Sequence, residues 1–269
     1  MSILKVNENF LPSERAAFLQ ETLNSAGFSD ISWVSSTGST NSDLLEAGQK
    51  GAQNLSVIIA DHQTAGRGRR DREWISEENS ALLMSVLFRT HESTGQLSRY
   101  SMKLSLSACQ VLHELGFDQI RIKWPNDLIV NHENRTSKLA GVLAQTISHK
   151  GQTLVVVGIG LNVISGNLKQ SLPDRDVVAL SEIGDPPDRV LLATKILENV
   201  ATLEDNESLL LGKYTTVLDT LGRKVRIQTE KEEITGEAVT VTPTGSLIVD
   251  LDNGELKEIF VGDVVHLHL

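Results

Sequence analysis

Four arginines stand within six residues, from Arg67 to Arg72, in a chain whose formal net charge is −10. Gly66 and Gly68 alternate with the first of them. Glycine lets the backbone approach a ligand closely, and the guanidinium fork suits carboxylate or phosphate oxygens. Short basic runs are also common on ordinary wet surfaces. The segment therefore predicts either an anion site or a solvated surface loop.

Two groups of small and polar residues could line a binding site as well. Ser39, Thr40 and Asn41 offer hydroxyls and an amide that can hydrogen-bond a neutral polar ligand. The same residue types favour helix N-termini, so capping alone explains them more simply. Gly158 and Gly160 are a weaker signal, which close strand packing in the centre of a sheet would explain. Residue types alone decide neither case.

Charged side chains flank two apolar segments farther along the chain. In the sequence KWPND, Pro125 fixes a turn after a strand and leaves Lys123, Asn126 and Asp127 near the end of a sheet. An Asx turn explains Asn126 and Asp127 equally well. Lys138 leads into the apolar segment KLAG, where a solvated side chain is the usual outcome. Both segments are candidates for a ligand site at a sheet edge.

The composition excludes several functional classes. The net charge of −10 argues against a general nucleic-acid-binding protein, which needs a broad basic surface. Cys109 is the only cysteine, so neither an internal disulfide nor a multi-thiolate metal site can form. The sequence holds no Walker A segment, dinucleotide fingerprint, G-x-S-x-G elbow or H-E-x-x-H pair. Without a signal-peptide pattern or a bilayer-spanning apolar run, a soluble cytoplasmic protein is expected.

These candidate residues need a scaffold, and apolar periodicity predicts a mixed α+β domain centred on a sheet. From this periodicity and from the end signals at Pro12, Gly27, Gly48 and Gly116, one helix is expected between Pro12 and Gly27, and a short one from the caps Thr40 and Asn41 to Gly48. Further helices are expected at residues 96–115, from a start within 184–189 to residue 200, and at residues 209–218. Strands are expected at residues 55–60, 80–88, 120–124, 139–147 and 153–163, with a polar loop at 131–137.

The pattern changes after Leu221 to short alternating strands, expected at residues 225–229, 238–241, 247–251 and 258–261. Turn residues at Thr244-Gly245 and Asn253-Gly254 separate some of them. Such a run predicts a small all-β barrel. We therefore expect two domains in contact, residues 1–219 and residues 220–269.

The order of these motifs resembles the catalytic core of biotin protein ligases. The motifs are STN at 39–41, QTAGRGRR at 63–70 with Trp74 downstream, KWPND at 123–127, KLAG at 138–141 and GIGLN at 158–162. The resemblance runs from about Ser36 to the C-terminus. It implies a class II synthetase-like domain, with a central mixed or antiparallel sheet flanked by helices, and an SH3-like C-terminal barrel. It also favours a short form without the N-terminal DNA-binding domain, because few residues precede the first motif.

The resemblance implies a reaction in two steps. Biotin and MgATP would form biotinyl-5′-AMP, and the biotinyl group would then pass to a lysine of the biotin carboxyl carrier protein of acetyl-CoA carboxylase. Negative charge concentrates on phosphoryl oxygens in the transition state, so fixed cations should supply most of the catalysis. Biotin is then the substrate, and ATP and Mg²⁺ are required beside it.

The motif match gives each candidate residue a role. Arg69 and Lys138 would be catalytic. Biotin would contact Ser39, Thr40, Asn41, Gln63, Gly66, Arg67, Gly68, Arg69, Lys138 and Gly141. ATP or the adenylate would contact Arg70, Trp74, Lys123, Asn126 and Asn162, and Asp127 would hold Mg²⁺. The arginine-rich loop should be mobile without ligand.

Three alternatives stay open. A lipoate or octanoate protein ligase has a related catalytic domain and the same adenylate chemistry, although GRGRR and KWPND favour biotin. A nucleic-acid-binding module is disfavoured by the net charge and by the lack of interleaved aromatic residues. The terminal barrel could also be an independent interaction module. We expect a carrier protein as partner, no binding to DNA or membranes, and a monomer or homodimer.

Overall fold

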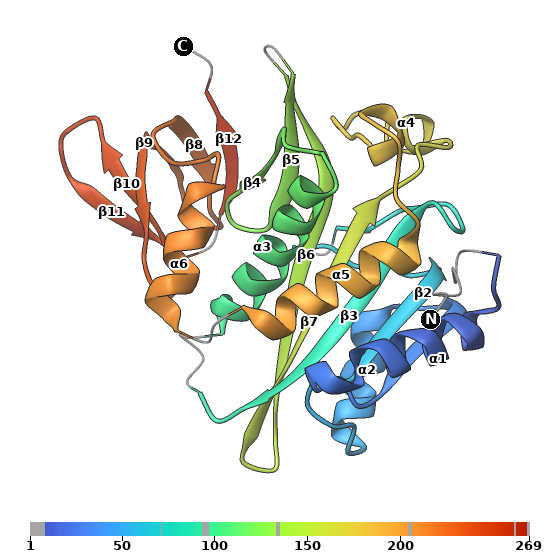
Figure 1. Ribbon diagram of the computed structural model, residues 1–269. Coiled ribbons are helices and arrows are strands. Elements are labelled where there is room, and N and C mark those ends of the chain that lie inside the picture. The colour runs from blue at the N-terminus through green and yellow to red at the C-terminus, as the bar shows by residue number, and fades with distance from the viewer. Residues whose placement is uncertain are drawn as a thin grey trace.

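The computed structural model describes residues 9–70, 72–92, 97–132, 135–203, 206–260 and 262–267. Seven strands of this described part form the larger of two sheets (Figure 1). Their bounds are β1 (Ile31–Thr37), β2 (Val57–Gln63), β3 (Ala81–Thr90), β4 (Ile120–Lys123), β5 (Asp127–His132), β6 (Arg135–His149) and β7 (Gln152–Asn162). The spatial order is β1-β2-β3-β7-β6-β5-β4. The pair β1 and β2 is parallel and the others are antiparallel, so the predicted mixed sheet is confirmed.

Helices cover both faces of this sheet, and the two faces serve different purposes. The helices are α1 (Pro12–Leu23), α2 (Thr40–Gln49), α3 (Ser98–Glu114), α4 (Leu168–Ser171), α5 (Arg189–Thr202) and α6 (Glu207–Thr216), with 3-10 turns η1 (Asn24–Ala26) and η3 (Leu180–Glu182). Figure 1 shows α3 and α5 lying across one face, where α1 also packs, and their apolar residues join the main core. On the other face, Leu44 of α2 packs against Leu87, Leu154 and Val156. None of the described helices is both long and apolar enough to span a bilayer.

The helix ends follow the local sequence signals. Pro12 occupies the first turn of α1, where its missing N–H leaves no hydrogen bond unmade. Gly27 follows η1 with φ of +91°, and Gly116 follows α3 with φ of +92°, a region that favours glycine. In α3, the spacing of Leu104, Ala108 and Val111 puts these side chains in the core. These predicted ends are confirmed.

A smaller antiparallel sheet follows the seven-stranded one. Five strands of the described chain form it: β8 (Lys224–Gln228), β9 (Glu233–Val241), β10 (Leu247–Leu251), β11 (Leu256–Ile259) and β12 (Asp263–His266). We call these strands the C-terminal sheet. Several contacts join it to the rest of the described chain. Among them, the Trp124 indole Nε1 donates to the Gly245 carbonyl at 2.8 Å, and the Ser98 hydroxyl donates to the Thr244 carbonyl. The predicted contact between the two units is confirmed.

Several predicted boundaries are wrong. The expected polar loop at 131–137 is largely the β5–β6 hairpin, because β5 pairs with β4 and β6 on either side and so tolerates polar residues at its end. Gly48 does not end its helix; it lies inside α2, where an added Cβ would come 3.1 Å from the Leu154 side chain. The strand expected at 258–261 is β11, which begins at Leu256, and β12 was not predicted. Gln96 and Val261, the ends of two predicted elements, lie outside the described residues.

Candidate active site

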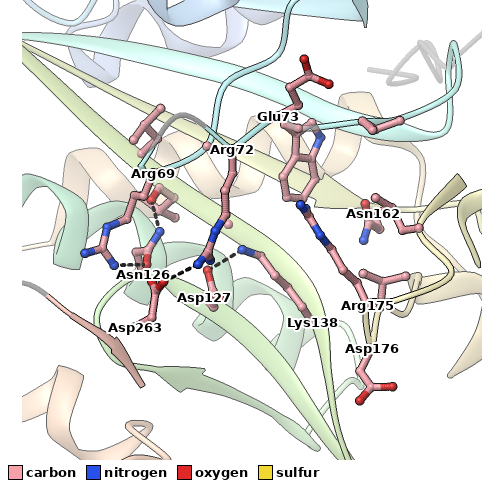
Figure 2. Close-up of a pocket in the computed structure, with 18 of the residues that line it drawn as sticks. Arg69, Arg72, Glu73, Asn126, Asp127, Lys138, Asn162, Arg175, Asp176 and Asp263 are labelled. Carbon is pink, nitrogen blue, oxygen red and sulfur yellow. Dashed lines mark hydrogen bonds and ion pairs between the residues drawn. The ribbon is translucent and has the colours of Figure 1, made fainter. Parts of the chain in front are cut away.

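A cavity of about 530 Å³ opens on the α2 side of the sheet, between the arginine loop and strands β4 to β7. We call residues 64–74 the arginine loop; residue 71 of this loop lies outside the described residues. The charged side chains that line the cavity are Arg67, Arg69, Arg72, Glu73, Lys123, Asp127, Lys138, Asp174, Arg175, Asp176 and Asp263. The cations come from several elements and meet in one place (Figure 2). Six of these side chains are cations and five are carboxylates, so the cavity offers cations to an anion without being strongly positive overall.

A second, smaller cavity of about 30 Å³ adjoins the first and shares Arg67, Trp74, Gly141 and Leu143 with it. Its other lining residues are Ser39, Thr40, Asn41, Gln63, Gly158, Ile159 and Gly160. This cavity is large enough for water but much smaller than the first one. Its walls are polar but uncharged apart from Arg67, so the two cavities together offer neutral hydrogen bonding beside a group of cations.

A buried hydrogen-bond network fixes the neutral wall. The Gln63 Oε1 atom accepts from the Thr40 backbone N–H at 2.8 Å and from its hydroxyl at 3.0 Å. The Ser85 hydroxyl lies 2.7 Å from that of Thr40 and donates to Asn41 Oδ1 at 2.6 Å. Asn41 Nδ2 donates to the Leu143 carbonyl at 3.1 Å. Thr40 and Asn41 lie inside α2 and their side chains face the sheet, so capping, the simpler explanation from sequence, is wrong for these two.

Two glycines of β7 leave room for side chains from other elements. A Cβ on Gly158 would lie 2.2 Å from Asn41 Oδ1. A Cβ on Gly160 would lie 2.4 Å from Cε2 of the Trp74 indole, which packs flat on that strand. The expected explanation, close packing of strands, is therefore wrong. Both glycines form the floor of the site.

The arginine loop folds back on itself and carries Trp74 into place. The Trp74 backbone N–H donates to the Gly66 carbonyl at 3.0 Å, and the Gly68 N–H donates to the Arg72 carbonyl at 2.6 Å. A Cβ on Gly66 would lie 2.5 Å from the Trp74 carbonyl oxygen. Glycine at this position therefore permits the close approach of the two arms of the loop.

Arg69 points from the loop toward strand β5. Its Nη1 donates to Asn126 Oδ1 at 3.1 Å, while Asn126 Nδ2 donates to the Val142 carbonyl at 2.7 Å. Burial lowers the pKa of Arg69, although Asp263 and Asp127 oppose the shift. Burial also lowers the pKa of Lys123, and Asp127 again opposes it. Partly buried cations of this kind gain from any anion that enters the cavity.

Lys138 lies across the cavity from the loop. Its Nζ is 2.7 Å from Asp127 Oδ1 and 5.9 Å from the centroid of the Trp74 ring. Its ammonium also lies against Gly141, since a Cβ there would be 3.1 Å from Nζ. Lys138 is therefore not the freely solvated side chain that its sequence context favours.

The motifs predicted to cooperate thus lie around connected cavities. Residues 33–162 match the biotin/lipoate A/B protein ligase family, and residues 220–267 match the biotin protein ligase C-terminal domain. A biotin–[acetyl-CoA-carboxylase] ligase of Mycobacterium tuberculosis is 32% identical over 253 residues, which cover 90% of this chain and 91% of the relative. This chain belongs to the biotin protein ligase family.

Other members of the family agree with this assignment. The bifunctional ligase/repressor BirA of Escherichia coli is 30% identical over 214 residues, which cover 77% of this chain and 65% of BirA. The biotin protein ligase of Aquifex aeolicus, solved in complex with biotin and ATP, superposes with a TM-score of 0.71 at 28% identity, covering 88% of this chain and 98% of that one. The predicted family and fold class are confirmed.

Arg70 and Asn162, which were expected to contact ATP or the adenylate, contact other parts of the protein in this structure. Arg70 lies outside the large cavity: its Nη1 is 3.1 Å from Asp263 Oδ2, and its Nη2 donates to the Gln228 carbonyl at 3.1 Å. Asn162 lines the cavity but is buried, and its Nδ2 donates to the Val178 carbonyl at 3.1 Å. Gly66 shapes the loop without lining either cavity.

The site also contains residues that the sequence did not single out. Asp263 enters the wall from β12, and Arg175 enters it from the segment after α4 (Figure 2). Neither lies in a motif, and only the folded chain brings them to the site. Arg72 does belong to the arginine run, and this membership was the available signal for it.

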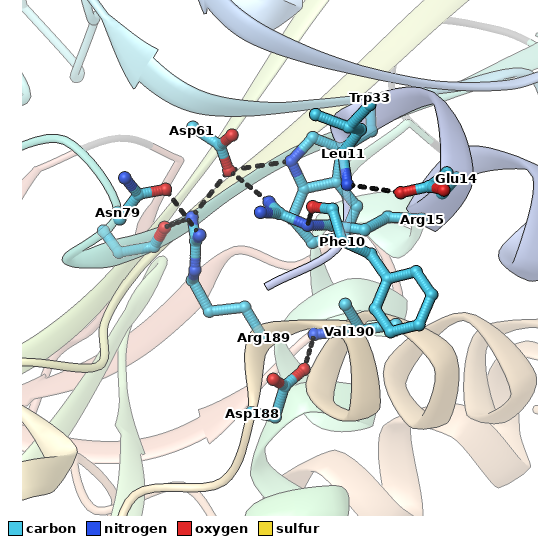
Figure 3. Close-up of polar contacts among 11 residues, drawn as sticks. Phe10, Leu11, Glu14, Arg15, Trp33, Asp61, Asn79, Asp188, Arg189 and Val190 are labelled. Carbon is cyan, nitrogen blue, oxygen red and sulfur yellow. Dashed lines mark hydrogen bonds and ion pairs between the residues drawn. The ribbon is translucent and has the colours of Figure 1, made fainter. Parts of the chain in front are cut away.

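A buried ionic cluster supports the base of the arginine loop (Figure 3). Asp61 Oδ1 is 2.8 Å from Arg15 Nη1 and 3.1 Å from Arg189 Nη1, and it accepts from Trp33 Nε1 at 2.9 Å. Arg189 Nη2 also donates to Asn79 Oδ1 at 2.8 Å, and the Asn79 N–H donates to the Asp61 carbonyl at 3.0 Å. Since Asp61 precedes the loop and Asn79 follows it, Arg189 ties the two ends together.

Proposed function

We propose that this chain activates biotin with ATP to form biotinyl-5′-AMP, and then transfers the biotinyl group to a lysine of a biotin carboxyl carrier protein. The chain is a biotin protein ligase. The observation that carries the mechanism is the junction of a small hydrogen-bonding pocket, whose only charged side chain is Arg67, with a larger cavity that holds Arg69, Lys123 and Lys138. A carboxylate must reach a phosphate there, although the two anions repel each other.

The neutral pocket suits the biotin ring. Its ureido group has two N–H donors and one carbonyl acceptor, and the hydroxyls and amides of Ser39, Thr40, Asn41 and Gln63 can satisfy both kinds. Trp74 lines this pocket too, and a shift of its indole would enlarge the space for the ring. Gly141 would lie beside the bound ring.

The larger cavity suits the reacting groups. Gly66, Arg67, Gly68 and Arg69 would close over the biotin tail and the phosphate. Lys138 would exchange its contact with Asp127 for the biotin carboxylate and the α-phosphate oxygens, where negative charge increases in the transition state. Arg69 and Lys138 are therefore the proposed catalytic residues.

The remaining residues of the cavity would bind the nucleotide. Trp74 offers an apolar surface for the adenosine, while Lys123, Asn126 and Asn162 line the same cavity. Arg70 would join them only if it left Asp263.

Asp127 would hold Mg²⁺. Among the described residues, no group of three or more His, Cys, Asp or Glu side chains could hold a metal by itself. Mg²⁺ fits this site because it is commonly held by one or two carboxylates together with substrate phosphates, and Asp127 lines the cavity. When bound, the ion would neutralise the charge of the ATP phosphates.

We further place the boundary between the two domains at residues 219 and 220, and the protein in the cytoplasm, with the carrier protein of acetyl-CoA carboxylase as acceptor. The match at 220–267 supports the boundary. The named function of the Mycobacterium tuberculosis relative supports the acceptor.

The decisive test offers the protein ATP and Mg²⁺ with either biotin or lipoate, and measures pyrophosphate release together with the acyl-adenylate. Pyrophosphate release and biotinyl-5′-AMP with biotin alone would support the proposal. Product formed only with lipoate would replace biotin ligation by lipoate ligation. The second step is tested by adding a carrier protein domain and measuring its gain in mass.

A further inference from the structure

We propose that Asp263 of the C-terminal sheet is a positioning residue for the nucleotide step, because its carboxylate holds the arginine loop against the cavity. This inference rests on the proposed function for the identity of the nucleotide. The contact itself lies between two regions far apart in the sequence (Figure 2).

Asp263 binds two arginines of the loop through one oxygen atom. Oδ2 is 3.1 Å from Arg70 Nη1 and also accepts from Arg72 Nη2. Arg70 makes a further hydrogen bond to the Gln228 carbonyl, and Gln228 pairs with Asp263 across β8 and β12. The outer arm of the loop is therefore fastened to one point of the C-terminal sheet.

The loop needs such a contact for two reasons. Its arginines lie close to one another and to the cavity cations Lys123 and Lys138, so like charges repel. Arg70 also has a φ of +52°, a conformation that costs energy for a residue with a side chain. A carboxylate on a β-strand offsets both effects, and it does so without occupying Arg69, which remains directed at Asn126.

The sign of the effect separates positioning from simple electrostatics. A carboxylate in the wall of a phosphate-binding cavity repels phosphates. If Asp263 did nothing else, its neutralisation would tighten ATP binding. Positioning predicts weaker ATP binding on neutralisation, even though the cavity becomes more positive.

The experiment compares the parent with Asp263→Asn, Asp263→Glu and the control Asp252→Asn. Asp252 serves as the control because it is also an acid near the C-terminal sheet. Its carboxylate lies 3.8 Å from Lys224 and is far more exposed than that of Asp263. We expect Asp263→Asn to raise the KM for ATP about fivefold, the scale of a partly exposed ion pair, with a smaller change in kcat. Asp263→Glu should recover part of the loss, and the control should match the parent.

A second measurement does not depend on activity. Trypsin cleaves after arginine, and cleavage follows the population of the released loop. Asp263→Asn should be cut after Arg70 or Arg72 several times faster than the parent and the control, with an unchanged thermal midpoint for the whole protein. Cleavage of Asp263→Asn at the parental rate would show that Asp263 does not hold the loop. Faster cleavage with an equal or lower KM for ATP would overturn its role in the nucleotide step.

The two proposals fail in different ways. If the parent makes no biotinyl-5′-AMP, the proposed function fails, whereas the trypsin measurement still decides whether Asp263 holds the loop. If the parent makes the adenylate and Asp263→Asn shows neither change, only the inference about Asp263 fails.

Discussion

Replacing Asp61 by alanine should destabilise the fold strongly. The Asp61 side chain is 6% exposed, and it faces Arg15 and Arg189, whose side chains are 6% and 1% exposed. Removing the carboxylate leaves two guanidinium groups in a buried place and also removes the acceptor of the Trp33 indole. Breaking a buried ion pair from one side costs about 3–5 kcal/mol.

That cost is a large share of a typical stability of about 5–15 kcal/mol. For a chain of this size, each kcal/mol moves the midpoint of thermal unfolding by roughly 2–4 °C, so a fall of roughly 6–20 °C is expected. Calorimetry and urea unfolding would measure it. The control is Glu46→Ala, which removes an exposed ion pair with Lys50 and should leave the midpoint unchanged.

A second variant tests the cause of the loss. Asp61→Ala combined with Arg189→Met removes a positive charge together with its partner, so the pair should lose less stability than the sum of the single changes. A thermal midpoint of Asp61→Ala within about 2 °C of the parent would be smaller than the expected fall and would refute the reasoning. Additive losses in the double variant would show that the charges are not coupled.

Three further predictions concern the site and the acid stability. Gly160→Ala should lower the free energy of unfolding by about 1–3 kcal/mol in urea unfolding, because its Cβ would overlap the Trp74 indole. An unchanged free energy of unfolding would contradict this packing. Arg69→Ala should slow the formation of biotinyl-5′-AMP or let it escape without altering the midpoint, and equal formation and retention would reject its catalytic role. Burial opposes ionisation of Asp219, but the His266 imidazole 3.3 Å away and hydrogen bonds from Arg223 and Asn131 outweigh it and lower the pKa of Asp219 to about 2. The stability that Asp219 contributes is therefore complete above its unfolded pKa of about 4 and is lost as the pH falls toward 2. Urea unfolding of Asp219→Asn should show a free energy of unfolding that changes less with pH in this range than that of the parent. Equal pH dependence of the two proteins would exclude the effect.

The sequence predicted those parts of the fold that depend on local signals. Pro12 and Gly27 marked helix ends because their backbone preferences act within one turn. Strand β5 was missed because its end is polar, and it is held by neighbours that lie elsewhere in the chain. Pairing across a sheet is not visible in the composition of one strand.

The same distinction applies to the site. The motif order identified Arg69 and Lys138, and the cavity brings both to one place. Local preference led to a wrong explanation for Thr40, because a hydroxyl at a helix start also suits the sheet that faces it. Asp263 could not be predicted, since its importance depends on the docking of β12 beside a loop that lies far away in the sequence.

Strand β7 serves two purposes through its alternation. Val155 and Val157 belong to the main core, while Gly158 and Gly160 face the site. Because neighbouring residues face opposite sides, deleting one residue early in β7 would turn branched side chains toward the ligand and glycines toward the helices. Insertions or deletions in this strand would therefore damage folding and ligation together. The floor of the pocket can then change only by substitution of residues.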